Sequence, residues 1–435
     1  MKLPVLCSTC SSSEDHIDPG GDCTASLKIL SASSTSSSYS LPSTSSTSSE
    51  ALSIQTFPSL PTLHPNFSAV SSQKTLPLSV SCSLVHSLNS PGSSQNALAF
   101  SQNALLLFSA SPSSITVYSS QNALTPKSTL PKMPSLLSAG SVKSIAVAGR
   151  APLLFFTAHQ DGKIRAWTAN NSGKVRLVSS LPTLADRILR YPIPSSHVAV
   201  RRHRRRLWIE HADAVSAVAA ASGLLYSVSW DKTLKIWRLS DLRCVQSVTA
   251  HDDAVNAVAV ASDGVVYTGS ADTRIRVWSR SGDRRRRHFL VATLEKHRSA
   301  VNALAVSGDG RVLYSGSNDR SILVWEREES AAHMAVVGAL RGHERAVMCL
   351  AAAGDGLVVS GSTDRTVRVW RRDGGGYSCL CVLRGHARGV RTLAAARAVV
   401  GEEGEEGYRV CSGSSDGEVR VWWVRVSECQ RSDSE

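Results

Sequence analysis

The chain has 435 residues, 42% of them hydrophobic and 19% charged, and its formal net charge is +13. It contains no run of 18 apolar residues that could span a bilayer, and its first ten residues lack the apolar core of a secretory signal. The ten cysteines have no regular spacing, and the single CxxC at 7–10 has no second pair, so we expect neither a metal site nor a cofactor. Such thiols fit a reducing compartment, and we expect the cytoplasm and nucleus.

Residues 1–77 are rich in Ser and poor in apolar side chains; 17 of the first 50 residues are Ser. Such a segment cannot bury enough surface to offset chain entropy, so we expect a disordered Ser-rich leader. It could serve as a phosphorylation platform or as a plain linker. A plastid transit peptide is also Ser-rich, but four acidic residues within 14–22 and the absence of Arg before residue 150 argue against one.

One unit of forty-odd residues recurs along the rest of the chain. Six times a Ser or Thr stands four residues before an Asp, and a Trp follows that Asp by six. The sets are Thr157/Asp161/Trp167, Ser227/Asp231/Trp237, Thr268/Asp272/Trp278, Ser315/Asp319/Trp325, Ser360/Asp364/Trp370 and Ser412/Asp416/Trp422. Each unit consists of short apolar runs separated by Gly, Asp and Ser turns, without helical periodicity. This pattern predicts four small strands per unit.

A His also precedes the Asp by about twenty residues in five of these sets. The five are His211, His251, His297, His343 and, with an insertion, His386. Together with two Gly-His pairs, at 342–343 and 385–386, the pattern closely resembles the WD40 repeat over about residues 78–426. The resemblance implies that the His, Ser or Thr, Asp and Trp of each set form one hydrogen-bonded chain inside a blade. Because an enzyme needs one base rather than five equivalent ones, we interpret these sets as structural and expect no catalytic activity.

The expected fold is all-β, one seven-bladed propeller over residues 78–430 with a short tail at 431–435. Residues 95–118 predict a degenerate first blade, in which Tyr118 replaces the Trp, Pro112 the Asp and Phe108 the Ser. The last blade stops soon after Trp422 without an outer strand. Residues 78–86 are predicted to supply that strand, because joining both ends of the chain in one blade removes its open edges.

Two arginine clusters account for most of the excess positive charge, and we expect both in long loops between blades. They are Arg201, Arg202, Arg204, Arg205 and Arg206, and Arg284, Arg285, Arg286 and Arg287. Basic runs of this kind are import signals, contacts for acidic partners or simply solvated loops. Specific nucleic-acid binding is disfavoured, because Trp208 is the one aromatic residue that accompanies the first cluster.

Several stretches are also similar to a narrower plant family of WD40 proteins, the JINGUBANG-like group. They lie at 200–203, 207–209, 211–215, 229–233, 250–257, 288–291 and 342–354. This resemblance implies a regulatory interaction platform in the cytoplasm and nucleus of plant cells, without catalytic activity. The Ser-rich leader and the second arginine cluster do not share it.

In a propeller of this family, the side chains that flank each turn Asp surround the entrance to the central channel. We expect a partner-binding rim there, made of Trp230, Lys232, Asn318, Arg320, Thr363 and Arg365. Trp230 stands out as a large aromatic residue in a turn, although it could also pack flat against its own blade. The basic side chains favour acidic or phosphorylated protein segments as partners, rather than small molecules or membranes.

The leading hypothesis is therefore a non-enzymatic scaffold that binds regulatory proteins. The alternative is a substrate receptor of a cullin-type ubiquitin ligase, a role that usually shows Trp-Asp-x-Arg at the end of a repeat. The nearest approach is Trp-Glu-Arg-Glu at 325–328, with the Arg one place early. A G-protein β subunit is disfavoured, because residues 1–77 contain no heptads for a coiled coil.

Overall fold

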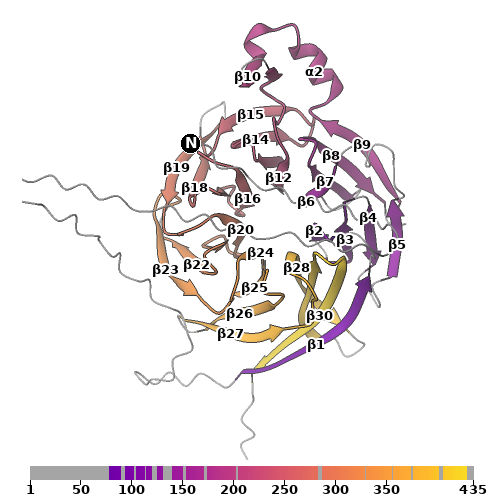
Figure 1. Cartoon of the computed structure of the whole chain (residues 1–435), viewed down its shortest axis with the longest axis vertical. Helices are drawn as coiled ribbons and strands as arrows, with labels where there is room; N and C mark the ends of the chain where they lie inside the picture. The colour runs from indigo at the N-terminus through magenta and orange to yellow at the C-terminus, as the bar shows by residue number, and fades with distance from the viewer. Residues whose placement is uncertain are drawn as a thin grey trace, which may run out of the picture. The chain divides into compact units, whose positions relative to one another are not determined.

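Seven four-stranded antiparallel sheets are arranged in a ring (Figure 1). The computed structural model describes residues 78–428 except for gaps at 90–93, 102–103, 113, 120–124, 131–139, 150–152, 171–173, 202–203, 283–286, 329, 355, 374–375 and 401–404. The predicted all-β, seven-bladed architecture is confirmed. The expected leader at 1–77 and tail at 431–435 lie outside the described residues.

The first four blades each contain four consecutive strands, with the first strand nearest the middle of the ring (Figure 1). Blade one comprises β2 (Ala97–Phe100), β3 (Leu106–Ala110), β4 (Ile115–Ser119) and β5 (Thr125–Leu130). Blade two comprises β6 (Val142–Ala148), β7 (Leu153–His159), β8 (Ile164–Ala169) and β9 (Val175–Leu181). Blade three comprises β12 (Val215–Ala221), β13 (Leu224–Ser229), β14 (Thr233–Arg238) and β15 (Cys244–Thr249). Blade four comprises β16 (Val255–Val260), β17 (Val266–Ser270), β18 (Ile275–Arg280) and β19 (His288–Leu294).

The last three blades repeat this order, except that the final one takes its outer strand from the start of the described chain. Blade five comprises β20 (Val301–Val306), β21 (Val312–Ser317), β22 (Ile322–Arg327) and β23 (Met334–Leu340). Blade six comprises β24 (Val347–Ala353), β25 (Leu357–Ser362), β26 (Val367–Asp373) and β27 (Gly376–Leu383). Blade seven comprises β28 (Val390–Val400), β29 (Glu405–Ser414), β30 (Glu418–Glu428) and β1 (Leu78–Asn89).

The β1 strand closes the ring by pairing antiparallel with β30, for example Cys82 with Val424. Both strands therefore gain a hydrogen-bonded neighbour that neither would have at the end of an open sheet. This is the place that the sequence predicts for the closing strand.

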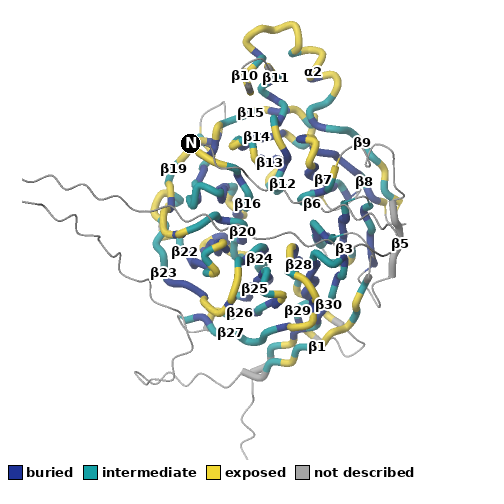
Figure 2. Tube along the Cα trace, viewed as in Figure 1, coloured by how far each residue is buried: buried dark blue, intermediate teal, exposed yellow. Residues whose placement is uncertain are grey.

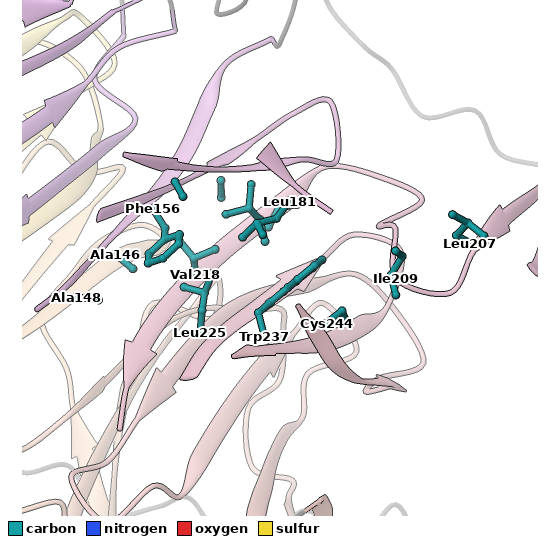
Figure 3. Packing of buried hydrophobic residues seen from close by; sticks show 14 residues of the cluster. Ala146, Ala148, Phe156, Leu181, Leu207, Ile209, Val218, Leu225, Trp237 and Cys244 are labelled. Atoms are coloured by element: carbon teal, nitrogen blue, oxygen red, sulfur yellow. The ribbon is translucent and has the colours of Figure 1, made fainter. Parts of the chain in front are cut away.

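The hydrophobic core is divided into clusters that lie between neighbouring blades. Figure 3 shows one cluster, in which Phe156 of blade two lies near Leu225 and Trp237 of blade three. The second strands of blades three to six are buried along their whole length. These strands have a sheet on each side, so their short apolar sequences are buried on both faces and hold adjacent blades together (Figure 2).

A Gly after the central Ser or Thr allows the blades to approach closely. A Cβ atom on Gly269 would lie 2.7 Å from Val301 of the next blade, and one on Gly316 would lie 2.7 Å from Val347. Such contacts are shorter than side chains tolerate, so the glycines are explained by packing between blades.

One segment between blades two and three leaves the ring (Figure 1). It contains α2 (Leu184–Arg190), the short 3-10 helix η1 (Pro194–Ser196), β10 (His197–Arg201) and β11 (Arg204–Leu207). The last two strands form an antiparallel hairpin. Within the described part of the chain, no helix is long and apolar enough to cross a membrane.

The first arginine cluster lies in the connection between blades two and three, where it is expected, whereas the second lies in sequence between two strands of a single blade. Arg201 ends β10 and three further arginines of that cluster, at 204–206, lie in β11, because this part of the connection forms a hairpin. Residues 284–287 lie in sequence between β18 and β19, which pair within blade four, so this cluster belongs to one blade. Of these, Arg284, Arg285 and Arg286 lie outside the described residues.

Candidate functional site

Four blades contain the complete hydrogen-bonded set that the resemblance implies. In blade six, Trp370 Nε1 donates to Ser360 Oγ at 2.8 Å, and the same oxygen lies 2.8 Å from His343 Nε2. His343 Nδ1 lies 2.7 Å from Asp364 Oδ2. The carboxylate requires a donor, so we place the imidazole proton on Nδ1 and let the Ser hydroxyl donate to Nε2. The equivalent sets are His211, Ser227, Asp231 and Trp237; His251, Thr268, Asp272 and Trp278; His297, Ser315, Asp319 and Trp325.

These sets hold turns and are closed to a substrate. Asp364 Oδ1 also accepts from the backbone N–H of Thr366 at 2.9 Å, so its carboxylate spans the turn. Burial lowers the pKa of His211 and of His251, against the opposing effect of their Asp partners, which keeps both rings neutral. A buried neutral His whose ring nitrogens are both engaged has no exposed face for acid–base chemistry.

Blade seven differs from the set that the sequence predicts. His386 Nε2 lies 2.7 Å from Ser412 Oγ as expected, but its Nδ1 has no hydrogen bond among the described residues and lies 3.5 Å from Glu418 Oε2. Glu418 stands where blades three and six have Thr, so a longer acidic side chain reaches the ring in place of Asp416.

The group of His386, Asp416 and Glu418 has ligand atoms within 4.8 Å of one another. However, Arg420 Nε donates to Glu418 Oε1 at 2.8 Å. This guanidinium already supplies the positive charge that the carboxylate requires, so the group fits an internal ion pair better than a metal ion.

Blades one and two contain substitutes that sequence reasoning missed. In blade two, His159 Nε2 lies 2.8 Å from Thr157 Oγ1, which accepts from Trp167 Nε1. In blade one, the expected Phe108 does not occupy the Ser position. In the strand register, each Trp lies opposite the residue two positions before the Ser or Thr of its set, as Trp237 lies opposite Leu225. Tyr118 lies opposite Leu107, so the Ser position of blade one is two residues after Leu107.

Ser109 therefore takes the Ser position of blade one, and its hydroxyl donates to Gln95 Oε1 at 2.8 Å. Both residues are buried. Ser109 and Tyr118 are nine residues apart where the other Ser or Thr and Trp pairs are ten apart. Because this turn is one residue shorter, the fixed spacing of the repeat does not identify Ser109.

The rim residues that precede the turn Asp occupy the same position in blades three, five and six. The backbone N–H groups of Trp230, Asn318 and Thr363 each donate to the carbonyl of an Ala in the preceding connection. The Trp230 side chain is 41% exposed, and Lys143 Nζ lies 5.3 Å from its ring centroid. Trp230 is thus available at the surface beside a cation, while Asn318 Oδ1 accepts from Asn302 Nδ2 at 2.7 Å.

The residue after the turn Asp adopts a left-handed conformation in six blades. Lys232, Thr273, Arg320 and Arg365 have φ values of 71°, 71°, 69° and 70°, and Gly162 and Gly417 take the same place in blades two and seven. Gly adopts this conformation without steric cost, whereas other residues are disfavoured by about 1 kcal/mol or more. Three basic side chains therefore stand at positions where backbone stability alone favours Gly.

Arg365 borders a hollow of about 650 Å³ at the junction of blades six and seven. Its lining residues are Glu344, Arg345, Thr363, Asp364, Arg365, Arg388, Gly389 and Ser415. Arg345, Arg365 and Arg388 are all exposed. Sequence reasoning found Arg365 and Thr363 but missed the other two arginines, each of which follows the His of its repeat by two residues. This two-residue interval after the His is the sequence signal that could have identified both arginines.

Comparison with known proteins supports the repeat assignment. The WD40 family model, described as "WD domain, G-beta repeat", matches residues 203–238, 242–279, 289–326, 334–371 and 377–422. A guanine nucleotide-binding protein subunit beta of Schizosaccharomyces pombe is 35% identical over 68 residues, which cover 15% of this chain and 22% of that protein.

Two other relatives match similarly short segments. Autophagy-related protein 16 of Arabidopsis thaliana is 26% identical over 139 residues, 28% of this chain and 27% of that protein. Mitochondrial division protein 1 of Pyricularia oryzae is 36% identical over 73 residues, 16% of this chain and 11% of that protein. Each match spans less than a third of the relative's length.

The seven-bladed ring and the five matched repeats identify the chain as a WD40-repeat protein. Proteins of this class are in general non-enzymatic scaffolds that bind other proteins.

Proposed function

We propose that this protein is a non-enzymatic scaffold whose rim holds an acidic or phosphorylated segment of a partner protein. The observation that carries the proposal is the hollow beside Arg365, where Arg345 and Arg388 are also exposed. Arginine binds carboxylates and phosphates through two parallel hydrogen bonds. Thr363 and Ser415 line the same hollow, and their hydroxyls donate to the carbonyls of Ala346 and Gly389 at 3.4 Å.

Trp230 supplies an apolar contact on the same ring of turns. Exposed Trp and Arg residues contribute much of the binding energy at protein interfaces. Lys143 beside the Trp230 ring adds positive charge, and burial lowers the pKa of this Lys, with Arg391 acting in the same direction. A partner segment that carries both an aromatic or aliphatic side chain and negative charges fits this surface.

The cellular setting of the proposal is regulatory signalling or transcriptional control in plant cells, in the cytoplasm and nucleus. Its support is the resemblance to the plant WD40 group at 200–203, 207–209, 211–215 and 250–257. The alternative role as a ubiquitin-ligase receptor has less support, because Arg327 pairs with Asp263 across to the neighbouring blade and is already engaged. Fluorescent fusions of the full chain would test the localisation.

The experiment for the rim is affinity purification with mass spectrometry from plant cells. The wild type is compared with Trp230→Ala/Lys232→Ala/Arg365→Ala and with the matched control Arg341→Ala, an exposed Arg that does not line the hollow. We expect specific partners to be lost with the triple variant alone, while circular dichroism shows an intact fold. Phosphatase treatment of the extract separates phosphorylated partners from acidic ones. An unchanged partner list in the triple variant would reject the rim as the binding site.

A further inference from the structure

The α2 helix presents its apolar side chains to solvent. Leu184, Ile188 and Leu189 are 70%, 64% and 61% exposed, whereas Asp186 is only 2% exposed. A surface helix of a globular protein normally buries its apolar side chains and exposes its charges. In α2 the arrangement is reversed, because Asp186 faces the ring and lies 3.5 Å from Arg243 Nε.

The apolar surface continues beyond the helix. Tyr191 is 73% exposed, and Ile193, Val198 and Val200 are exposed as well. Seven of the sixteen large hydrophobic residues that are exposed in the described part of the chain therefore fall within 184–200. Single exposed apolar residues are ordinary, but a concentration of this kind marks an interaction surface.

This segment is anchored to the ring on its inner side. Leu207 and Ile209 are buried in the core cluster that contains Trp237. Arg187 Nε lies 2.8 Å from Glu210 Oε1, and the Arg190 guanidinium lies 4.7 Å from the Trp208 ring centroid. The exposed side chains are thus held on a preformed support, which reduces the entropy cost of binding.

Two adjoining hollows give the surface its shape and charge. One of about 290 Å³ lies between α2 and β11, where Leu184, Ile188 and Tyr191 meet Arg205 and Arg206. The second, of about 540 Å³, shares Leu184 and both arginines and extends to Lys163. The acidic residues in these linings, Asp161 and Glu210, are each paired with an Arg.

We propose that α2 and the β10–β11 hairpin form a second docking surface, here called the insertion surface. Its occupant is a short amphipathic segment of a partner protein, with large apolar side chains on one side and Asp or Glu beside them. The apolar side chains would enter the hollows, and the acidic ones would meet Arg205, Arg206 and Lys163. The insertion surface contains none of the six named rim residues, so the protein is a scaffold with two binding sites of different chemistry.

The charge and shape of the insertion surface favour a protein segment over two other occupants, a second copy of the chain and an anionic membrane. A second copy of the chain would bring the same basic residues against one another, and such like charges repel. An anionic membrane would match the charge, but a flat lipid surface has no projecting side chains to fill concave hollows. A protein segment satisfies the charge, the apolar area and the shape together.

The test is a selection of random peptides displayed on phage, using the full-length protein as bait. The bait variant Leu184→Ser/Ile188→Ser/Leu189→Ser removes apolar area, and Lys163→Glu/Arg205→Glu reverses charge. All of these side chains are exposed, so both variants should keep the fold, which circular dichroism and Tm would verify. Phe289→Ser is the matched control, since Phe289 is also exposed, at 51%, but lies on β19 of blade four.

We expect the selected peptides to combine apolar and acidic residues. Fluorescence polarisation should show at least about tenfold weaker binding to each insertion variant, and unchanged binding to Phe289→Ser and to Arg365→Ala of the rim. Binding to the charge variant should also depend less on salt. Failure of the rim experiment would leave these results standing, because no residue is shared.

Three results would overturn the proposal. The first is that no peptide is enriched, or that the enriched peptides lack acidic residues or bind the insertion variants as tightly as the wild type. The second is that phosphatidylserine vesicles bind the wild type and not the apolar variant, which assigns the surface to lipid. The third is that light scattering shows a dimer that the apolar variant converts to monomer, which assigns it to self-association.

Discussion

The Sγ atoms of Cys82 and Cys381 lie 2.6 Å apart, although 299 positions separate the two residues in the chain. Cys82 lies in the closing strand β1 of blade seven, and Cys381 lies in the outer strand β27 of blade six. The two thiols thus meet where the ring closes, and neither is fully buried.

Hydrogen peroxide is expected to join Cys82 and Cys381 in a disulfide. One thiol is first oxidised to the sulfenic acid with release of water, and the second thiol displaces a second water. The hydrogen bond between the two thiols lowers the pKa of Cys82, which favours its thiolate, whereas burial raises the pKa of Cys244 and of Cys411 to about 12. Peptide mapping by mass spectrometry should find this one cross-link.

Cys379→Ser is the control for the cross-link, because Cys379 is a further partly buried thiol on β27, two residues before Cys381. It should leave the disulfide intact, whereas Cys381→Ser should abolish it. The oxidised protein should also show a Tm several degrees higher, because the bond closes a loop of about 300 residues. A Cys379–Cys381 bond instead would contradict the geometry.

Removing the central hydroxyl of a set should destabilise the fold strongly. Ser360→Ala deletes the acceptor of Trp370 Nε1 and the partner of His343 Nε2, and all three side chains are buried. Leaving buried polar groups without partners costs about 1–3 kcal/mol each, so we expect a loss of about 2–5 kcal/mol in the free energy of unfolding. Urea denaturation measures this loss, and a value below 1 kcal/mol would show that water replaces the hydroxyl.

The difference between blades six and seven can be measured with matched His variants. His343→Ala removes a ring that contacts Ser360, Asp364 and, at 3.3 Å, Thr366 Oγ1. His386→Ala removes a ring that is hydrogen-bonded to Ser412 alone, because His386 Nδ1 has no hydrogen bond in the described structure. Both variants remove the same side chain, so the additional hydrogen bonds of His343 should make His343→Ala cost about 1–2 kcal/mol more. Equal losses would indicate that Glu418 bonds to His386 as strongly as Asp364 does to His343.

Arg320 and Arg365 have a left-handed backbone conformation, so substitutions there can separate effects on stability from effects on partner binding. Arg320→Gly and Arg365→Gly should keep or raise the free energy of unfolding, by up to about 1 kcal/mol, because Gly adopts a φ near 70° without strain. Arg365→Val should instead lose about 1–2 kcal/mol, since a β-branched residue is poorly tolerated there. Urea denaturation checks both signs, and the Gly variants then test partner binding on an undamaged fold.

Acid should destabilise the protein through its buried His residues. Burial lowers the pKa of His159 to about 3 and of His288 to about 4, from an ordinary value near 6.5. The unfolded chain then binds more protons below pH 6.5, so stability is present above that pH and is lost as the pH falls toward each folded value. At pH 5 each group should cost about 2 kcal/mol relative to pH 7.

Urea denaturation at pH 7 and pH 5 tests this dependence, with His159→Gln as the comparison. Gln is uncharged over this range and can still bond to Thr157, so the variant should lose about 2 kcal/mol less than the wild type on going to pH 5. An identical pH dependence in the variant would show that His159 does not contribute.

The blades themselves could be predicted from sequence, because each depends on local spacing. The interval from Ser360 to Asp364 to Trp370 specifies a hairpin, its capped turn and the pairing of adjacent strands, all within a dozen residues. The closing strand was also predictable. The last blade lacks an outer strand and the first blade is preceded by an extra one, and pairing the two removes both open sheet edges. The rim positions followed from the same repeat, by their place relative to each Asp.

Only the tertiary structure decided the contacts between blades and the departures from the repeat. The proximity of Cys82 to Cys381, the exchange of Glu418 for Asp416 beside His386, and the hollow that gathers Arg345 with Arg388 all join residues that different units supply. The reversed burial of α2 likewise depends on where the insertion meets the ring. Local sequence determines which strands form, but the packing of one sheet on the next determines which side chains meet and which remain exposed.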